Sequence, residues 1–245
     1  MDRNEKNLTF GNLEKVIQID LSRAVRIRRA TRRMVKSFRR NDFRIRKIIA
    51  SKYWKRASNR TSQMMHAATN FAVRSAVENH AALALEDLGG IRRMYHRGRS
   101  QGRDYRFRLN SWAYGRTHRM LEYKAGWYGV TFIRLTKAET RGSSTSHHAC
   151  GERLRSPERS DVAHRRMLWC EACNVWVDRD VNAALNLSKR GLTRLASSLP
   201  QQVARELLTG EKGEAREAVR GNETATPILR VDASRSGVRA HYPST

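Results

Sequence analysis

The stretch from Thr145 to Leu187 constrains the fold more than any other part of the sequence. Cys150 is followed by a glycine, and about twenty positions later Cys170 and Cys173 form a C-x-x-C pair. Pairs of metal-binding side chains at such spacing form the knuckles of small zinc ribbons. An Asp-Arg-Asp sequence follows directly, and its second aspartate, Asp180, stands where it can cap an alanine-rich helix. The sequence therefore predicts a metal-clamped ribbon that delivers a carboxylate to a helix start.

A tetrahedral zinc site needs four ligands, and the chain has only three cysteines. His147 stands three positions before the first cysteine and would complete a set of three cysteines and one histidine. His148 and His164 are the alternative fourth ligands. The competing interpretation is a degraded site that holds metal poorly. Three cysteines do not make a disulfide framework, which fits a reducing compartment.

The charge of the chain indicates a polyanionic partner. Its 245 residues include 49 Lys and Arg against 23 Asp and Glu, a formal net charge of +26. A folded protein gains nothing from such self-repulsion, so nucleic acid is the predicted partner. A membrane surface is the alternative, but the sequence has no long apolar segment and no signal-peptide pattern. A merely well-solvated surface is the third interpretation. We therefore expect a cytoplasmic, nucleoid-associated protein without a membrane partner.

The first part of the chain predicts a hairpin followed by two helices. Two β-rich runs, 8–10 and 16–21, flank a Gly-Asn turn signal. From Ser22 to Phe38 apolar residues recur at helical spacing among arginines, which predicts an amphipathic helix with a basic outer face. A second helix is expected from about Asp42 to Asn79. Its predicted inner stripe is apolar: Ile45, Ile48, Ile49, Met64, Ala68, Phe71 and Ala72.

A short apolar run from Ala81 to Leu85, closed by glycines, predicts a buried parallel strand. Glu86 stands at its carboxyl end, where ligands collect in open α/β sheets. A carboxylate is costly to bury unless it is paired or holds a metal, so Glu86 is a candidate ligand. The alternative is a loop glutamate just past the strand.

The segment from Ile91 to Phe107 is dense in arginine, glycine and aromatic residues. This composition predicts a flexible loop that faces nucleic acid. A helix over 109–125 is expected to follow, with Trp112, Met120 and Tyr123 in its core face. A β-branched strand is expected over 128–135.

The last part of the chain, after Asp180, is expected to contain a helix and a tail. The helix that begins after Asp180 is expected to stop at Gly191, because glycine commonly ends helices. The tail from Leu192 mixes small and charged residues and is expected to be partly disordered.

Several stretches together resemble one family. The order D-R-N (2–4), L-E-D-L (85–88), ribbon and D-R-D-V-N-A-A (178–184) is similar to that of the TnpB (OrfB) proteins of bacterial and archaeal insertion sequences. These are relatives of the type V CRISPR effector nucleases. Further matching motifs spread the resemblance over almost the whole chain: L-N-S-W (109–112), E-Y-K-A (122–125) and E-T-R-G-S-S (139–144).

The resemblance implies an α/β fold with an RNase H-like (RuvC) mixed sheet and an inserted zinc ribbon. The nuclease core would cover 1–140, the ribbon 141–177, the last RuvC segment with its helix 178–191, and the tail 192–245. The family also implies RNA-guided DNA cleavage beside a transposon-end motif, with DNA and a guide RNA as partners.

The family's catalytic carboxylates fall on Asp2, Glu86 and Asp180, and its first ribbon cysteine falls on His147. Three carboxylates from separate elements can hold two divalent cations that bracket the attacking water and the leaving oxygen of a phosphodiester. Mg²⁺, which prefers carboxylates, waters and phosphate oxygens, suits this chemistry. Asp178 would be a neighbour of this set or a solvated loop residue.

One departure from the family concerns Asp2. The family carries this aspartate near the end of a central strand, and that strand precedes the first residue here. We therefore expect a gap in the sheet, Asp2 on a frayed terminus, no guide-recognition region, and weak cleavage or none. The alternatives are an inactive remnant that only binds nucleic acid and a zinc-ribbon DNA-binding regulator, which would leave Glu86 unexplained.

Nucleic-acid contacts are expected along the basic helices from Arg23 to Arg60. They are also expected in the arginine-rich loop, where Arg97, Arg99 and Arg103 are the candidate phosphate ligands.

Overall fold

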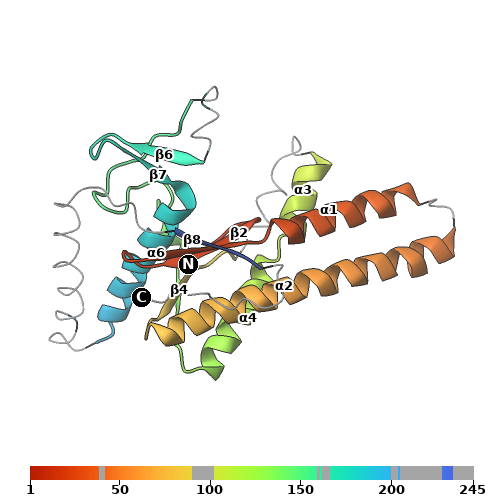
Figure 1. Ribbon diagram of the computed structural model, residues 1–245, viewed down its shortest axis with the longest axis horizontal. Coiled ribbons are helices and arrows are strands. Elements are labelled where there is room, and N and C mark those ends of the chain that lie inside the picture. Colours follow the sequence, from red (N-terminus) through yellow and green to blue (C-terminus); the bar gives the residue numbers. More distant parts are fainter. Residues whose placement is uncertain are drawn as a thin grey trace, which may run out of the picture.

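The chain folds around a divided β-sheet (Figure 1). The computed structural model describes residues 1–38, 42–89, 102–158, 161, 166–199, 204 and 228–233. One sheet has the strand order β1-β2-β3-β8, a second contains β4 and β5, and the hairpin β6–β7 stands apart. The strands are β1 (Asp2–Arg3), β2 (Asn7–Gly11), β3 (Val16–Asp20), β4 (Leu83–Glu86), β5 (Phe132–Leu135), β6 (Met167–Cys170), β7 (Val175–Asp178) and β8 (Ile228–Asp232).

The predicted hairpin is present as β2 and β3, which pair antiparallel from Asn7–Asp20 to Gly11–Val16. Gly11 is required at the turn, because a Cβ there would lie 2.1 Å from the carbonyl oxygen of Lys15. The strands alternate between two apolar faces. Ile17 and Ile19 join the main core, whereas Val16 packs against Val181 and Leu185 on the opposite face.

The helices on one face are α1 (Ser22–Ser37), α2 (Ala50–Glu78) and α4 (Tyr114–Trp127). Helix α2 packs through Met64, Met65, Ala68, Ala72 and Val73, all buried. These side chains belong to the main core, which they share with residues of β2, β3 and α4. The prediction of one long helix is confirmed, although it begins as the π-helical turn η1 (Ile45–Ile49).

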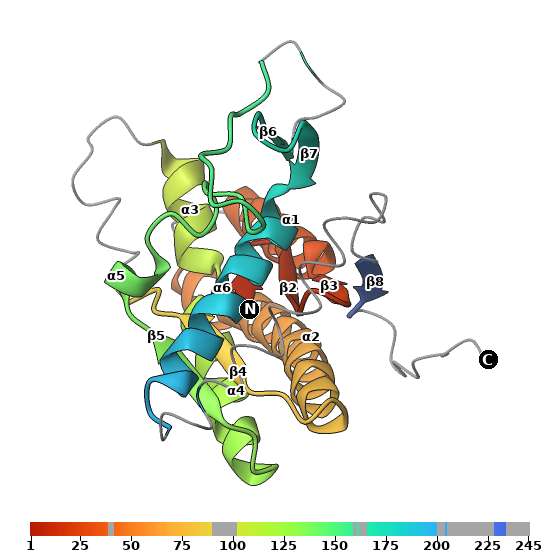
Figure 2. The same ribbon diagram turned by 90° about the vertical axis from the view of Figure 1, so that its left-hand side faces the viewer.

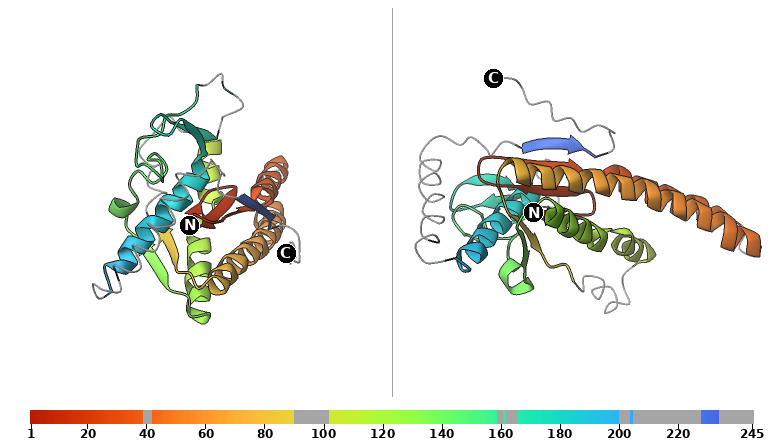
Figure 3. Two further views of the ribbon diagram at one scale, coloured as in Figure 1. Left: turned by 60° about the vertical axis from the view of Figure 1, so that its left-hand side comes forward. Right: turned by 90° about the horizontal axis from the view of Figure 1, so that it is seen from below.

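The predicted inner stripe is wrong at the beginning of this helix. Ile48 is 48% exposed and Ile49 36% exposed, because η1 and the first turns of α2 lie beyond the sheet, beside α1 and, at Trp54, α3 (Figures 1 and 3). The apolar periodicity continues there without a core to receive it. Phe38 and Tyr53 cover each other at this end, with ring centroids 5.4 Å apart.

The segment expected as one helix over 109–125 is two helices. Helix α3 (Arg103–Ser111) is followed by its C-cap residue Trp112, and α4 begins at Tyr114. Residues 103–107 are therefore helical, where a loop was predicted, and residues 90–101 lie outside the described residues. Met120 is buried as expected, but Tyr123 is 37% exposed and packs on Trp127 instead of the core.

Helix α6 (Arg179–Ala196) covers the opposite face of both sheets (Figure 2). Leu187 packs between Ala84 of β4 and Leu135 of β5, two strands that pair in parallel as predicted. The expected stop at Gly191 is wrong, since the helix continues to Ala196. A Cβ on Gly191 would lie 2.3 Å from the Cβ of Ala84. This glycine therefore permits close packing between helix and strand instead of ending the helix.

The two sheets are separated by a cavity of about 390 Å³. Phe10 and Ile17 line it from the first sheet, and Leu83 and Ala84 line it from the second. The gap that was expected at the centre of a nuclease sheet stays a prediction. The terminus is not frayed, because the Met1 ammonium group donates to the Ala84 carbonyl oxygen at 2.8 Å.

The C-terminal tail was expected to be partly disordered, and most of it lies outside the described residues. One described piece is ordered: β8 pairs in parallel with β3, from Ile228–Val16 to Asp232–Asp20. Sequence analysis missed this strand.

Gly191→Ala should lower the free energy of unfolding by about 1–3 kcal/mol, because the added methyl group overpacks the contact with Ala84. Gly126→Ala is the matched control, since a Cβ on this helical glycine of α4 meets no atom within 4 Å. That substitution should be neutral or stabilising by up to about 1 kcal/mol. Urea denaturation followed by circular dichroism compares the two, and equal effects would contradict the packing role of Gly191.

Candidate metal centre and carboxylate site

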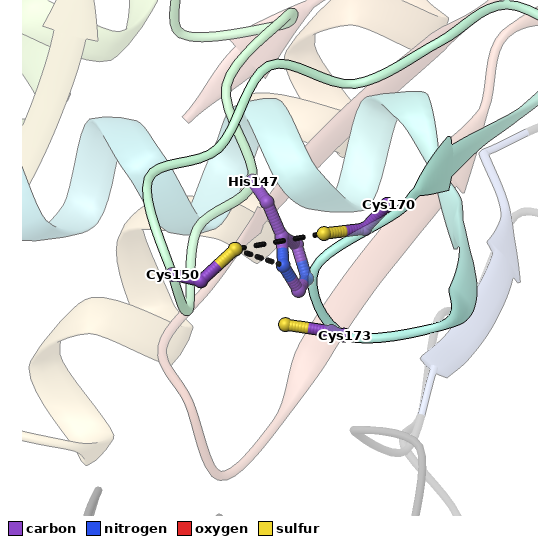
Figure 4. Close-up of side chains that lie close together, drawn as sticks. All are labelled: His147, Cys150, Cys170 and Cys173. Carbon is purple, nitrogen blue, oxygen red and sulfur yellow. Dashed lines mark hydrogen bonds between the residues drawn. The ribbon is translucent and has the colours of Figure 1, made fainter.

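Four predicted metal ligands come together at the ribbon (Figure 4). Their ligand atoms, from His147, Cys150, Cys170 and Cys173, all lie within 4.8 Å of one another. The His147 Nδ1 atom is 3.2 Å from the Cys150 sulfur, which is 3.5 Å from the Cys170 sulfur. In a tetrahedral zinc site with Zn–S bonds of 2.3 Å, sulfur atoms lie about 3.8 Å apart. The donor set and its size therefore fit zinc.

The electrostatics of the cluster also favour a cation. Desolvation and the neighbouring thiols of Cys150 and Cys170 raise the pKa of Cys173 to about 12. Three thiols this close cannot all ionise without a positive charge between them. Burial lowers the pKa of His147, which keeps the imidazole neutral as a metal ligand requires.

Each knuckle is held by local backbone geometry. In the first, the His147 N–H donates to the Glu152 carbonyl oxygen at 2.8 Å and the Gly151 N–H donates to the His147 carbonyl oxygen at 2.9 Å. Gly151 has φ +80°, which favours glycine after Cys150. In the second, Asn174 takes a positive φ of 54° in the turn between β6 and β7.

Neither alternative fourth ligand is needed. The His148 ring lies against Asn182 of α6, with Nδ1 at 3.3 Å from the amide oxygen. Burial, the neighbouring His147 and Lys189 lower the pKa of His148 to about 4, although its contact with Asn182 opposes this shift. His164 lies outside the described residues.

The three predicted carboxylates come from β1, the end of β4 and the first turn of α6. Burial, followed by the charges of Glu86 and Asp180, raises the pKa of Asp2 to about 7. Burial also raises the pKa of Glu86, with Arg3 opposing it. The charges of Glu86 and Asp180 therefore act on the Asp2 carboxyl group. They are less tightly grouped than the His/Cys ligands, which among the described residues are the one set whose ligand atoms converge within 4.8 Å.

Asp180 is buried, and two side chains hold it. Asn7 of β2 donates from Nδ2 to its Oδ2 atom at 2.8 Å, and the Arg166 guanidinium group forms an ion pair with the same oxygen. The Oδ1 atom of Asn7 is buried and has no hydrogen-bond partner among the described residues. Sequence analysis missed both residues, since neither belongs to a motif that was recognised. The available signal for both residues was Asp180, the acidic residue that they contact.

Asp178, and not Asp180, is the N-cap of α6. Its Oδ1 atom accepts from the backbone N–H groups of Asp180 at 2.8 Å and Val181 at 3.2 Å. The prediction that Asp180 caps the helix is thus wrong by two residues. The consequence is a division of roles, because Asp178 fixes the helix start and leaves the Asp180 side chain inside the site.

Arg3 links β1 to the other sheet. Its guanidinium group donates to the carbonyl oxygens of Glu86 at 2.5 Å and Tyr114 at 3.3 Å, and the side chain is buried. The contact places Asp2 and Glu86 on adjacent chain segments. Asp2 itself accepts from Asn4 Nδ2 at 2.7 Å.

Of the arginines predicted to contact nucleic acid, Arg103 begins α3, whereas Arg97 and Arg99 lie outside the described residues. Some basic residues of α1 are engaged in the fold. Arg32 pairs with Asp104 at 2.6 Å and lies 4.3 Å from the centre of the Phe107 ring, which fastens α3 to α1.

Comparison with known proteins finds a family model and relatives that match this chain. Residues 114–187 match the model of the family described as "Cas12f1-like, TNB domain". The TnpB-like protein MJ0751 of Methanocaldococcus jannaschii is 28% identical over 200 residues, which cover 78% of this chain and 67% of that protein. The putative RNA-guided DNA endonuclease Rv2885c of Mycobacterium tuberculosis is 26% identical over 164 residues, 67% of this chain and 33% of that protein.

A solved structure, the cryo-EM structure of a Cas12f1–sgRNA–target DNA complex, is similar with a TM-score of 0.49 and 17% identity over 75% of this chain and 49% of that one. The matched residues include all four His/Cys ligands of the ribbon. The chain is thus similar to TnpB-like proteins, in agreement with the predicted resemblance. It spans about two thirds of the length of the archaeal relative and one third of the mycobacterial one. Among the described residues, no helix has the length and apolar character of a membrane span.

The purified protein should contain about one zinc per chain, and Cys170→Ser should remove it, because the buried Cys170 sulfur is central to the cluster. His118→Gln, a change on α4 away from the ribbon, should leave the metal content unchanged. Elemental analysis after dialysis measures both variants. Full zinc retention by Cys170→Ser would exclude this site.

Asp2 should make stability depend on pH when no Mg²⁺ is present. Because its pKa is raised to about 7 from 3.8, its contribution to stability is fully present below about pH 4 and is lost as the pH rises to about 7. The shift corresponds to at most about 4 kcal/mol. We expect Asp2→Asn to be more stable than wild type at pH 8. Denaturant titrations of zinc-loaded protein between pH 4 and 8 test this, and a stability difference that is constant across that range would refute it.

Proposed function

We propose that this chain supplies a RuvC-type, RNase H-like nuclease site to a TnpB-like, RNA-guided DNA endonuclease. The observation that supports it most is the burial of Asp180 in the first turn of α6, beside strands that carry Asp2 and Glu86. Burial, and then the charges of Glu86 and Asp180, raise the pKa of Asp2, in keeping with this arrangement. The resemblance to TnpB proteins supports these three carboxylates as the catalytic positions. Asp2, Glu86 and Asp180 are therefore the proposed ligands of two Mg²⁺ ions.

Bound Mg²⁺ would activate the attacking water and stabilise the charge on the leaving oxygen of a phosphodiester. The protein's own contribution is placement. The Asp178 cap and the Asn7 hydrogen bond fix Asp180, and Arg3 holds the end of β4 that carries Glu86. The orphaned Oδ1 atom of Asn7 could accept a hydrogen bond from a water of the metal shell.

DNA and a guide RNA are the proposed partners. The net charge of +26 supports polyanion binding, and the basic α1–α2 pair that projects beyond the sheet is the proposed contact surface. The ribbon is proposed to be a structural zinc module, and the core, ribbon and tail divide at 140, 177 and 191 as the family resemblance implies.

The second candidate is a protein that binds nucleic acid without cleaving it. The ion pair between Arg166 and Asp180 favours it, because a guanidinium group then occupies an oxygen that a metal would need. Mn²⁺ titration distinguishes the two. A nuclease site should bind Mn²⁺ and displace Arg166, whereas a binding remnant should leave Asp180 paired.

In a guide-dependent assay with target DNA, Glu86→Ala and Asp180→Ala should lower Mg²⁺-dependent cleavage to background and leave nucleic-acid affinity unchanged. Asp178→Ala is the matched control, since it removes an N-cap worth about 1 kcal/mol and keeps the proposed ligands. It should reduce cleavage without abolishing it. If Asp178→Ala is inactive and Asp180→Ala is active, the ligand is Asp178 instead.

Binding to DNA or RNA should weaken steeply with salt and show little sequence preference. Replacing Lys52, Lys55 and Arg56 of α2, all exposed, by Gln should lower the slope of log affinity against log salt by about 2–3, since each phosphate contact contributes about 0.9. Arg155→Gln with Arg194→Gln is the control, because both arginines pair with glutamates. Fluorescence anisotropy at several salt concentrations measures the slopes. An affinity that hardly responds to salt would contradict a phosphate-dominated interface.

A further inference from the structure

One face of α6 is hydrogen-bonded to the backbone of the first zinc knuckle. Three polar side chains at helical spacing, Asn182, Asn186 and Lys189, all reach the segment 143–148. Lys189 donates to the His148 carbonyl oxygen at 2.6 Å. Both asparagines are buried, and Asn182 is fully inaccessible to solvent. Buried amides are retained where their hydrogen bonds are satisfied, so this stripe is a built contact.

The contacts of Asn182 bracket the metal ligand His147. The Asn182 amide nitrogen donates to the Ser146 carbonyl oxygen at 2.8 Å, and its amide oxygen accepts from the His148 N–H at 2.8 Å. The residue before His147 and the residue after it are therefore fixed by one side chain (Figure 4 shows His147 beside α6). The network also sets the orientation of the amide, because only its oxygen can accept from the His148 N–H.

We propose that Asn182 is a positioning residue for the ribbon metal, which holds the His147 imidazole at the angle that the three sulfur atoms require. This inference rests on the proposed zinc site. Groups that orient a ligand without touching the metal commonly change metal affinity by 10- to 100-fold. The same side chain follows Asp180 by two residues on α6, so the ribbon and the carboxylate site share one rigid element.

Asn186 provides a control of the same chemistry. Its Nδ2 atom donates to the carbonyl oxygens of Ser143 and Ser146, each at 2.8 Å, but no contact of Asn186 reaches His148 among the described hydrogen bonds. If Asn186 is lost, Asn182 still donates to these carbonyl oxygens at 3.4 and 2.8 Å. If Asn182 is lost, the His148 N–H loses the partner that the structure gives it. The proposal therefore predicts unequal effects from two matched substitutions.

The experiment compares Asn182→Leu and Asn186→Leu in the full chain by zinc competition with a chromophoric chelator and by the absorption spectrum of the Co²⁺-substituted protein. Asn182→Leu should weaken zinc binding 10- to 100-fold and alter the Co²⁺ d–d bands, because the histidine ligand is no longer fixed. Asn186→Leu should change the affinity less than threefold and keep the spectrum.

The proposal is overturned if Asn182→Leu keeps the wild-type zinc affinity and Co²⁺ spectrum. It is also overturned if Asn186→Leu loses as much zinc affinity as Asn182→Leu, because both side chains would then only hold the ribbon against α6. Helix content by circular dichroism verifies folding, and Asn182→Ala supports the same comparison if the leucine variant does not fold. The Cys170→Ser variant separates a failure of the Asn182 proposal from a failure of the zinc site itself. If that variant keeps zinc, the zinc site itself is wrong, whatever Asn182 does.

Discussion

The packing of α6 across both sheets is the interaction on which the rest of the structure depends. In the part of the chain that the structure describes, the two sheets do not pair with each other, and a cavity lies between them on the side of Phe10 and Leu83. Helix α6 spans this division, with Val181 and Leu185 on the first sheet and Leu187 between the strands of the second. Burial of such side chains stabilises a domain by about 1.5–3 kcal/mol each. One amphipathic helix thus joins two sheets that are otherwise linked through the hydrogen bonds of Met1 and Arg3 and through the main core.

The same helix has a polar side that serves the two candidate sites. Its N-terminus lies where β7 ends, so the ribbon hairpin leads directly into the Asp178 cap, and Asp180 follows inside the first turn. One turn further, Asn182 and Asn186 contact the first knuckle. A helix is stiff over this length, so the metal ligands and the carboxylate are held at a fixed separation. Zinc in the ribbon would therefore stabilise the frame around Asp180 as well as the ribbon itself.

The sequence predicted the features that depend on local pattern. The Gly-Asn hairpin, the parallel strand that ends in Glu86, and the four ribbon ligands were all readable, because turn chemistry, apolar runs and knuckle spacing are short-range signals. The errors have a common cause in tertiary contacts. Gly191 resembles a helix stop until Ala84 is known to lie against it, and the isoleucines of η1 look like core until the end of the sheet is known. Strand β8 pairs with a segment about two hundred residues away, which no local pattern reveals.

The carboxylate site illustrates why geometry had to come from the fold. Asp2, Glu86 and Asp180 are far apart in sequence. The side chains that contact this region, Arg3, Asn7 and Arg166, gave no local signal for these contacts. Arg166 stands at the start of β6, where its backbone carbonyl oxygen accepts from the Arg179 N–H. Its guanidinium group therefore reaches Asp180 only while β6 and β7 are paired. Because the second knuckle closes the other end of this hairpin, metal in the ribbon and the charge beside Asp180 are linked through two short strands.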